Sequence, residues 1–148
     1  MSQKLEHMTH LHGDTLVEKS HPRILFRGKL DSLIALVMLT RCELEIYSAE
    51  LDEIQEVLQS LMRAEVLDTP VVCDTLFGQS FDELRAESHA LYAAKPVASK
   101  AYALLNVLRT AVRETELAAV MAFGEERADI VRALNRLSSG VYVLMCRG

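Results

Sequence analysis

Two arginines late in the chain are the residues that most suggest a ligand. Arg109 and Arg113 stand four residues apart, so on a helix they share one face. Like charges at this spacing destabilise an isolated helix slightly unless an anion meets them. The pair therefore predicts an anion site, although an exposed face on which Glu116 pairs with Arg113 explains the pattern equally well.

A second polar group lies near the C-terminus, where Asn135 is followed by Ser138 and Ser139. Asn and Ser are poor residues for a helix interior because their side chains compete for backbone hydrogen bonds. Their place in a predicted helix indicates a polar role inside the protein, which a hydrogen bond between helices would also satisfy. Asp31 stands near the start of a predicted helix, where an acid is favourable in any protein.

The beginning of the chain contains a possible phosphate loop. Gly13, Asp14 and Thr15 are followed by Lys19, Arg23 and Arg27. Glycine lets the backbone approach an anion closely, and lysine and arginine supply positive charge for phosphate. Gly-Asp also marks ordinary turns, and the pattern by itself favours a turn.

Metal binding is not the first expectation for this chain. His7, His10 and His12 have a spacing that could hold a divalent metal, but no carboxylate or cysteine is fixed beside them on a regular element. A mobile His-rich arm is the preferred interpretation. The three cysteines are far apart and form no Cys-x-x-Cys pair, so we expect reduced thiols in a cytoplasmic protein.

Helices must position these residues, because apolar residues recur at three- and four-residue steps over most of the chain. The spacing predicts helices over 28–67, 80–92, 97–122 and 126–146. Ser80 and Glu83 are placed like a capping box, and Gly124 ends a helix. We expect an all-α protein, an antiparallel four- to five-helix bundle in a single domain. Residues 1–26 would form a non-helical arm and residues 27–148 the bundle.

The composition of the 148 residues excludes several classes of protein. The net charge is −5 and the 16 lysines and arginines do not gather into one run, so nucleic acid is not an expected partner. No apolar run reaches membrane-spanning length and no signal peptide is evident, so we expect no membrane partner. Half of the residues are hydrophobic, which allows a core without disulfides.

Taken in order, the polar segments resemble the corrinoid adenosyltransferases of the propanediol- and ethanolamine-utilisation types. The resemblance rests on Gly13-Asp14-Thr15, Lys19 with Arg23-Ile24, Gly28-Lys29-Leu30-Asp31, Leu108 to Arg113, and Leu134-Asn135-Arg136-Leu137-Ser138. Their order and approximate spacing agree over nearly the whole chain. The amino-acid sequence of the first segments is most similar to that of the ethanolamine branch.

The resemblance implies that the protein transfers the 5′-deoxyadenosyl group of ATP to cob(I)alamin, which gives adenosylcobalamin and triphosphate. It implies that phosphate groups meet Gly13, Asp14, Thr15, Lys19, Arg113 and a Mg²⁺ ion. It also implies that Asn135 holds the nucleoside and that Asp31 and Arg109 form a buried pair between helices.

The resemblance carries two further expectations. An aromatic or apolar side chain should lie against the lower face of the corrin, and Tyr92 and Phe77 are the candidates. The family tends to form trimers that bind ATP between neighbouring subunits, so we expect a homo-oligomer and favour a trimer.

Two other classes of function stay open. A non-catalytic carrier of corrinoid or ATP would keep the pocket without the chemistry. Ser139 stands where the family's closing motif is followed by Asp, and this slightly favours a carrier. A helical scaffold without a ligand is the second alternative, because a fold alone never excludes it.

Overall fold

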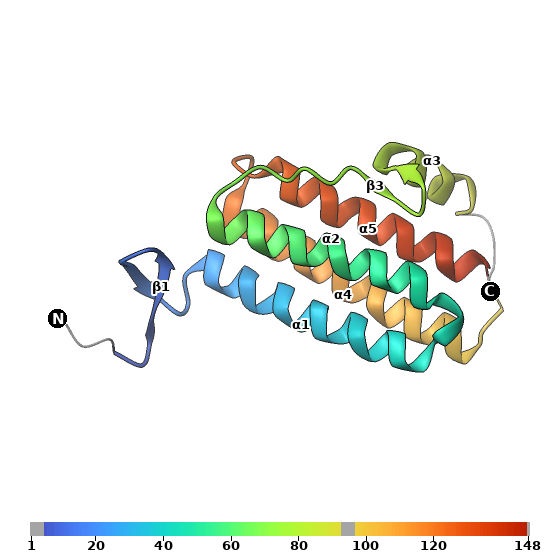
Figure 1. The fold of residues 1–148 in the computed structure, drawn as a ribbon, viewed down its shortest axis with the longest axis horizontal. Coiled ribbons are helices and arrows are strands. Elements are labelled where there is room, and N and C mark those ends of the chain that lie inside the picture. The colour runs from blue at the N-terminus through green and yellow to red at the C-terminus, as the bar shows by residue number, and fades with distance from the viewer. Residues whose placement is uncertain (1–4, 93–96, 148) are drawn as a thin grey trace.

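The computed structural model describes residues 5–92 and 97–147. Four long helices lie side by side: α1 (Pro22–Glu43), α2 (Ser48–Leu67), α4 (Lys100–Phe123) and α5 (Ala128–Arg147). Helices α1 and α5 run in one direction and α2 and α4 in the other (Figure 1). A short helix, α3 (Phe81–Ala90), packs on the outside of α5. The predicted all-α antiparallel bundle is therefore confirmed.

The first predicted helix is in fact two helices. Helix α1 ends at Glu43, and a short 3₁₀ turn (η1, Glu45–Tyr47) reverses the chain before α2. Leu44 has non-helical backbone angles, with φ −126° and ψ 71°, and its N–H makes the last hydrogen bond of the helix, to the Thr40 carbonyl. Leu44 and Tyr47 are nevertheless buried, so the apolar period continues through the turn and hides it. The single helix predicted over 28–67 was wrong for this reason.

Helix α1 also begins earlier than predicted. It starts at Pro22, so the arm is shorter than the predicted 1–26. The imidazole Nδ1 of His21 accepts a hydrogen bond from the backbone N–H of Arg23, at 3.1 Å, and caps the helix. Pro22 suits the first turn because proline has no backbone N–H, and the N–H groups of a first turn have no partner within the helix.

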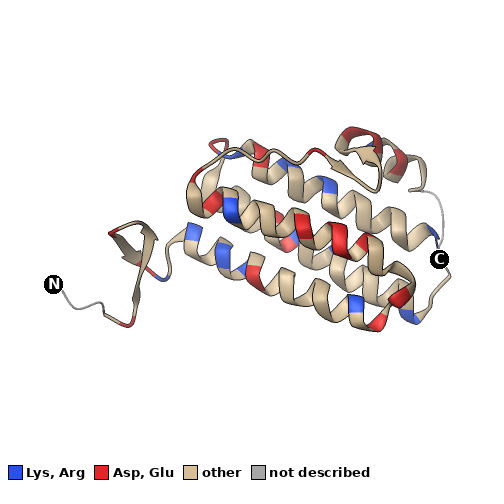
Figure 2. Ribbon diagram, viewed as in Figure 1, with Lys and Arg blue, Asp and Glu red and all other residues tan. Residues whose placement is uncertain are grey.

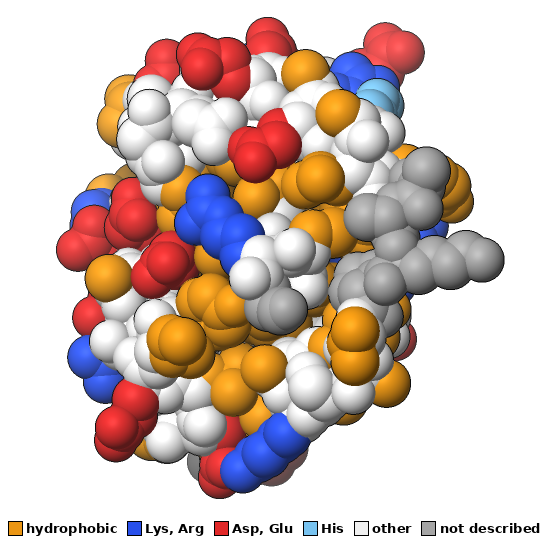
Figure 3. Space-filling view, turned by 90° about the vertical axis from the view of Figure 1, so that its right-hand side faces the viewer, with side chains coloured by type: hydrophobic (Ala, Val, Ile, Leu, Met, Phe, Trp, Pro, Cys, Tyr) orange, Lys and Arg blue, Asp and Glu red, His pale blue; other side chains and the backbone are white. Residues whose placement is uncertain are grey.

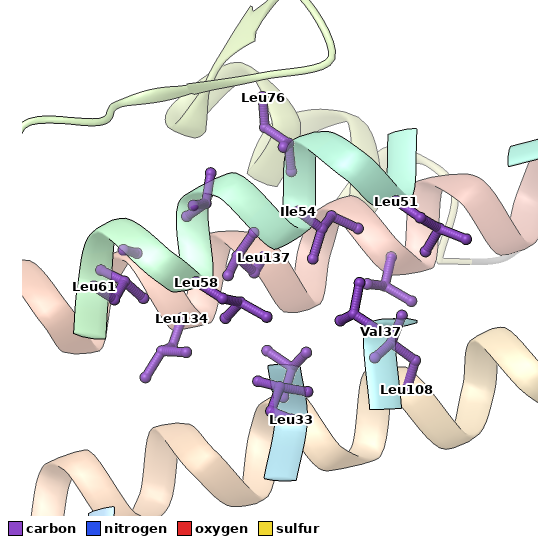
Figure 4. Close-up of a cluster of buried hydrophobic side chains, with 14 of the residues drawn as sticks. Leu33, Val37, Leu51, Ile54, Leu58, Leu61, Leu76, Leu108, Leu134 and Leu137 are labelled. Carbon is purple, nitrogen blue, oxygen red and sulfur yellow. The ribbon is translucent and has the colours of Figure 1, made fainter. Parts of the chain in front are cut away.

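The core lies between the four long helices. Leucines and other aliphatic side chains from each helix meet there with almost no exposure: Leu33, Val37, Leu51, Ile54, Leu58, Leu61, Leu108, Leu134 and Leu137 (Figure 4). Positively and negatively charged residues are interspersed along the helices (Figure 2). Apolar side chains are exposed on the surface at the end of the bundle where α5 ends (Figure 3). No helix of the described residues is long and apolar enough to cross a membrane.

The connection from α2 to α4 carries a small hairpin and α3. Strand β3 (Thr75–Leu76) pairs with β4 (Gln79–Ser80), and the Ser80 hydroxyl accepts the N–H of Glu83 at 3.1 Å, which confirms the predicted cap. Leu76 points from this connection toward the core (Figure 4). A glycine on α5 makes room for it, because a Cβ at Gly140 would lie 2.8 Å from Leu76 Cδ2 and would force that side chain to shift.

The start of α5 is tied to the same connection. The Asp129 carboxylate accepts hydrogen bonds from the N–H of Val71, at 2.9 Å, and from Arg127 Nε, at 3.1 Å. Partial burial would raise the pKa of Asp129, but the Arg127 guanidinium and the backbone N–H groups outweigh it and hold this pKa below its ordinary value.

The arm before α1 is a β-hairpin, which the sequence pattern did not predict. Strand β1 (Met8–His12) pairs antiparallel with β2 (Thr15–Glu18), and Gly13 turns between them with φ of +50°. The hairpin lies beyond the first residues of α1, at one end of the bundle (Figure 1). None of residues 5–20 is buried.

Candidate functional site

A cavity of about 810 Å³ lies between α3, α4 and α5, within the range of ~300–1,000 Å³ that is common for ligand sites. Its lining comes from three segments: Arg85, Ser88, His89 and Tyr92; Arg109, Arg113, Glu116 and Leu117; and Asn135, Ser138, Ser139 and Tyr142. Each set repeats at three- and four-residue steps, so each follows one face of its helix, with Tyr92 just beyond the end of α3. The cavity thus brings together four predicted site residues: Tyr92, Arg109, Arg113 and Asn135.

The lining is predominantly cationic. Three arginines, Arg85, Arg109 and Arg113, contribute to the lining, but only a single carboxylate, Glu116. Arg113 is exposed and forms no ion pair with any described residue. The alternative in which Glu116 neutralises Arg113 is therefore not observed. A cavity with this charge suits an anionic ligand.

Glu116 instead holds Asn135. The amide Nδ2 of Asn135 donates to Glu116 Oε2 at 3.3 Å, and its Oδ1 accepts from Arg136 Nη1 at 2.6 Å. Arg136 also donates to Asp82 at 3.2 Å. Hydrogen bonds from Arg132 and Arg136 lower the pKa of the Asp82 carboxyl group. This chain of polar contacts joins α3, α4 and α5 beside the cavity and fixes the Asn135 side chain.

Asp31 and Arg109 do not form the predicted buried pair within one chain, so that prediction was wrong. Asp31 is exposed on α1 and makes no ion pair with the described part of the chain. Arg109 donates through Nε and Nη2 to Asn106 Oδ1, at 3.1 and 2.9 Å, and its side chain lines the cavity. A neighbour one turn away on the same helix thus satisfies the guanidinium locally.

The predicted phosphate loop does not reach the cavity within one chain. Gly13, Asp14, Thr15 and Lys19 are all exposed on or beside the hairpin, which lies beyond the start of α1, whereas α3 covers the outside of α5 (Figure 1). Arg23 and Arg27, expected to add charge for phosphate, are both bound by Glu65. Within one chain, the residues of the predicted phosphate loop are therefore separate from those that line the cavity.

The two aromatic candidates differ in position. Tyr92 lines the cavity and is 80% exposed, and its ring centroid lies 6.4 Å from that of Tyr142. The Tyr142 hydroxyl donates to the Leu91 carbonyl at 3.2 Å. The pKa of Tyr142 is raised, mainly because the side chain is desolvated and secondly because Cys146 lies beside it. Phe77 packs beside Gly140, outside the cavity lining. The geometry favours Tyr92 as the exposed aromatic surface.

The cavity does not form a metal site from its own side chains. Glu116 is its single carboxylate and is already hydrogen-bonded to Asn135. Within residues 5–92 and 97–147, no three His, Cys, Asp or Glu side chains are grouped to hold a metal ion. A Mg²⁺ ion at this place would depend on oxygen ligands from a nucleotide.

Sequence reasoning overlooked the wall that α3 contributes. Arg85, Ser88 and His89 continue to Tyr92 at helical spacing, and this polar stripe on a short helix was a detectable signal. Tyr142 was not predicted because an aromatic residue in a helix usually packs in the core.

The sequence of the chain is similar to those of known proteins. The sequence model of the cobalamin adenosyltransferase family matches residues 2–147. The corrinoid adenosyltransferases EutT of Salmonella typhimurium and Escherichia coli K12 are 42% and 41% identical to the chain, over 97% and 98% of its length. The chain spans 59% and 60% of those two relatives.

Solved structures share the fold. A variant PduO-type ATP:corrinoid adenosyltransferase from Lactobacillus reuteri, complexed with cobalamin and ATP, superposes with a TM-score of 0.74 at 21% identity, covering 95% of this chain and 87% of that one. A second variant of that type, complexed with ATP, gives a TM-score of 0.71 at 23% identity and covers 96% and 89%. With the family match over almost the whole sequence, the chain belongs to the cobalamin adenosyltransferase family.

Proposed function

We propose that the protein transfers the 5′-deoxyadenosyl group of ATP to the cobalt of cob(I)alamin. The cobalt electron pair forms the bond to C5′, the C5′–O bond breaks, and triphosphate leaves with the bonding electrons. The observation that carries the proposal is the cationic cavity in which Arg109, Arg113 and Asn135 meet, in a chain of this family. The relatives named EutT favour the ethanolamine branch.

The cavity residues suit this reaction because the protein need not supply a nucleophile or a base. It must stabilise a highly charged leaving group and hold the carbon in line with cobalt. Arg113 supplies an unpaired guanidinium for the triphosphate of Mg²⁺-ATP, Asn135 holds the nucleoside, and Tyr92 offers an aromatic face to the corrin. The free thiols of the described cysteines suit the reducing cytoplasm.

We also propose that the phosphate loop reaches the cavity of a neighbouring copy in a homo-oligomer, with a trimer favoured by the resemblance. In one chain the loop lies beyond the start of α1 (Figure 1), and none of its residues is among those that line the cavity. Helix α4 exposes the apolar side chains Val107, Leu117 and Met121 by 55%, 63% and 81%, a face that a second copy would cover.

Light scattering tests the assembly. Met121→Glu should lower the mass from oligomer to monomer and abolish turnover, because a charge in a buried interface is costly. Val72→Glu is the matched control, since Val72 is 88% exposed in the connection and away from α4. A wild-type mass equal to one chain would refute the shared site.

The activity test mixes the protein with Mg²⁺-ATP and chemically reduced cobalamin and follows adenosylcobalamin by its absorption spectrum. Arg113→Ala should reduce turnover, whereas Arg63→Ala, at an exposed arginine of α2 outside the cavity, should not. A thermal shift with Mg²⁺-ATP but no product would identify a carrier. If neither a thermal shift nor product is observed, the helical scaffold without a ligand is the remaining interpretation.

A further inference from the structure

Glu65 is the only ionisable side chain that is fully buried in the described part of the chain. It lies in the last turn of α2 and accepts hydrogen bonds from two arginines of α1. Arg23 Nε reaches Glu65 Oε1 at 2.9 Å, and Arg27 Nε reaches Oε2 at 2.5 Å. One carboxylate thus fixes two guanidinium groups, one helical turn apart, at the end of the bundle nearest the hairpin.

The hairpin is held to the bundle by polar contacts. No residue from 5 to 20 is buried, so apolar packing contributes little to its position. Two hydrogen bonds from its strand β1 cross to the bundle. The Leu11 carbonyl accepts from Arg27 Nη2 at 2.9 Å, and His12 Nδ1 donates to the Val66 carbonyl, which follows Glu65, at 3.3 Å.

Of the two arginines bound by Glu65, only Arg27 also donates a hydrogen bond to the hairpin. Its guanidinium is planar, so fixing Nε and Nη2 on Glu65 also fixes the direction of the bond to Leu11. Arg23 has the same chemistry, but its other bond goes to the backbone carbonyl of Glu65 itself, at 3.2 Å. Arg23 therefore joins α1 to α2, whereas Arg27 joins both helices to the hairpin.

We infer that Arg27, oriented by Glu65, is a positioning residue that sets the place of the β1–β2 hairpin and, through it, the affinity for nucleotide. The second half rests on the proposed function, in which the Gly13-Asp14-Thr15 turn contacts the triphosphate. The Arg27 guanidinium already donates to Glu65 and to the Leu11 carbonyl, and its side chain is only 17% exposed. Arg27 thus acts on the nucleotide through the hairpin and not as a phosphate ligand.

The experiment compares Arg27→Lys with Arg23→Lys in the full-length chain. Each variant keeps the charge opposite Glu65, and both arginines stand on α1 one turn apart. Lysine lacks the planar fork of Nε and Nη2, so it cannot hold Glu65 and the Leu11 carbonyl in this fixed geometry. The readouts are hydrogen exchange of the amides in the β1–β2 hairpin, the midpoint of thermal unfolding, and KM and kcat for ATP in the adenosylation assay.

Arg27→Lys should speed exchange in the hairpin by about three- to tenfold, the change expected when one charge-assisted hydrogen bond is lost. KM for ATP should rise by a similar factor while kcat stays constant, because only the placement of the binding loop changes. Arg23→Lys should leave hairpin exchange and KM at their wild-type values. A similar effect of both variants on hairpin exchange, or no effect of either, would overturn the inference.

The two halves of the inference fail in different ways. Faster hairpin exchange in Arg27→Lys with an unchanged KM for ATP would overturn the link to nucleotide and keep the anchoring role. If the wild type itself forms no adenosylcobalamin, the proposed function fails, and the exchange measurements still decide whether Arg27 positions the hairpin.

Discussion

Replacing Gly140 by alanine tests how closely the connection after α2 packs on α5. The new methyl group would lie 2.8 Å from Leu76 Cδ2 and 3.3 Å from Phe77 Cε2, whereas carbon atoms are normally about 3.5–4.0 Å apart. Leu76 is only 2% exposed, so its side chain can yield only by displacing its neighbours in the core.

The expected effect is the balance of two terms. Overpacking a filled core costs about 1–3 kcal/mol. Alanine favours a helix over glycine by about 1 kcal/mol. Gly140→Ala should therefore lower the free energy of unfolding by about 1 kcal/mol, instead of raising it as the same substitution does at an open helical site.

Urea unfolding followed by circular dichroism measures this effect in a double-mutant cycle with Leu76→Val. Valine lacks the methyl group that reaches Gly140, so Gly140→Ala should cost about 1 kcal/mol less in that background. Equal costs in the two backgrounds, or a more stable Gly140→Ala single variant, would refute the packing explanation.

Three further predictions concern the cavity and the bundle. Arg113→Ala and Asn135→Ala should each reduce the thermal shift produced by Mg²⁺-ATP while leaving the circular dichroism spectrum unchanged, and full shifts in both would place the site elsewhere. Glu65→Gln should lower the free energy of urea unfolding by about 2–4 kcal/mol because two guanidinium groups lose their buried partner. Asp52→Asn, at an exposed pair on the same helix, should change it by less than about 1 kcal/mol, and equal losses would contradict the role of burial. The lowered pKa of Asp129 adds stability that is present above the unfolded value of about 3.9 and is lost as pH falls through the folded value. Between about pH 6 and about pH 3, the wild type should therefore lose more unfolding free energy than Asp129→Asn, and parallel pH profiles would argue against this linkage.

The helical class and several helix ends could be predicted because they depend on local chemistry. Apolar spacing identified the inner faces, Ser80 identified the start of α3, and Gly124 identified the end of α4. The turn between α1 and α2 escaped prediction because Leu44 and Tyr47 keep the apolar period while the backbone leaves the helix. Periodicity reports which side of the chain is buried and says nothing about its direction.

The cavity could be predicted in part. Two arginines and an asparagine at unusual helical positions identified its α4 and α5 walls, because such residues need a polar partner. The partners themselves could not be predicted, since they depend on which helix faces which. Glu116 meets Asn135 and not Arg113, and Glu65, an ordinary acid in sequence, becomes the buried partner of two arginines 42 and 38 residues away.

The contacts of Asn135 give its amide group a fixed polarity. Its oxygen faces the Arg136 guanidinium and its nitrogen faces the Glu116 carboxylate. A half-turn of the amide would set NH₂ against a cation and C=O against an anion, so both contacts oppose the flip. The remaining N–H and the remaining lone pair of Asn135 are therefore presented in a single order. A molecule entering the cavity meets a donor and an acceptor that cannot exchange places, and it can match them in only one orientation.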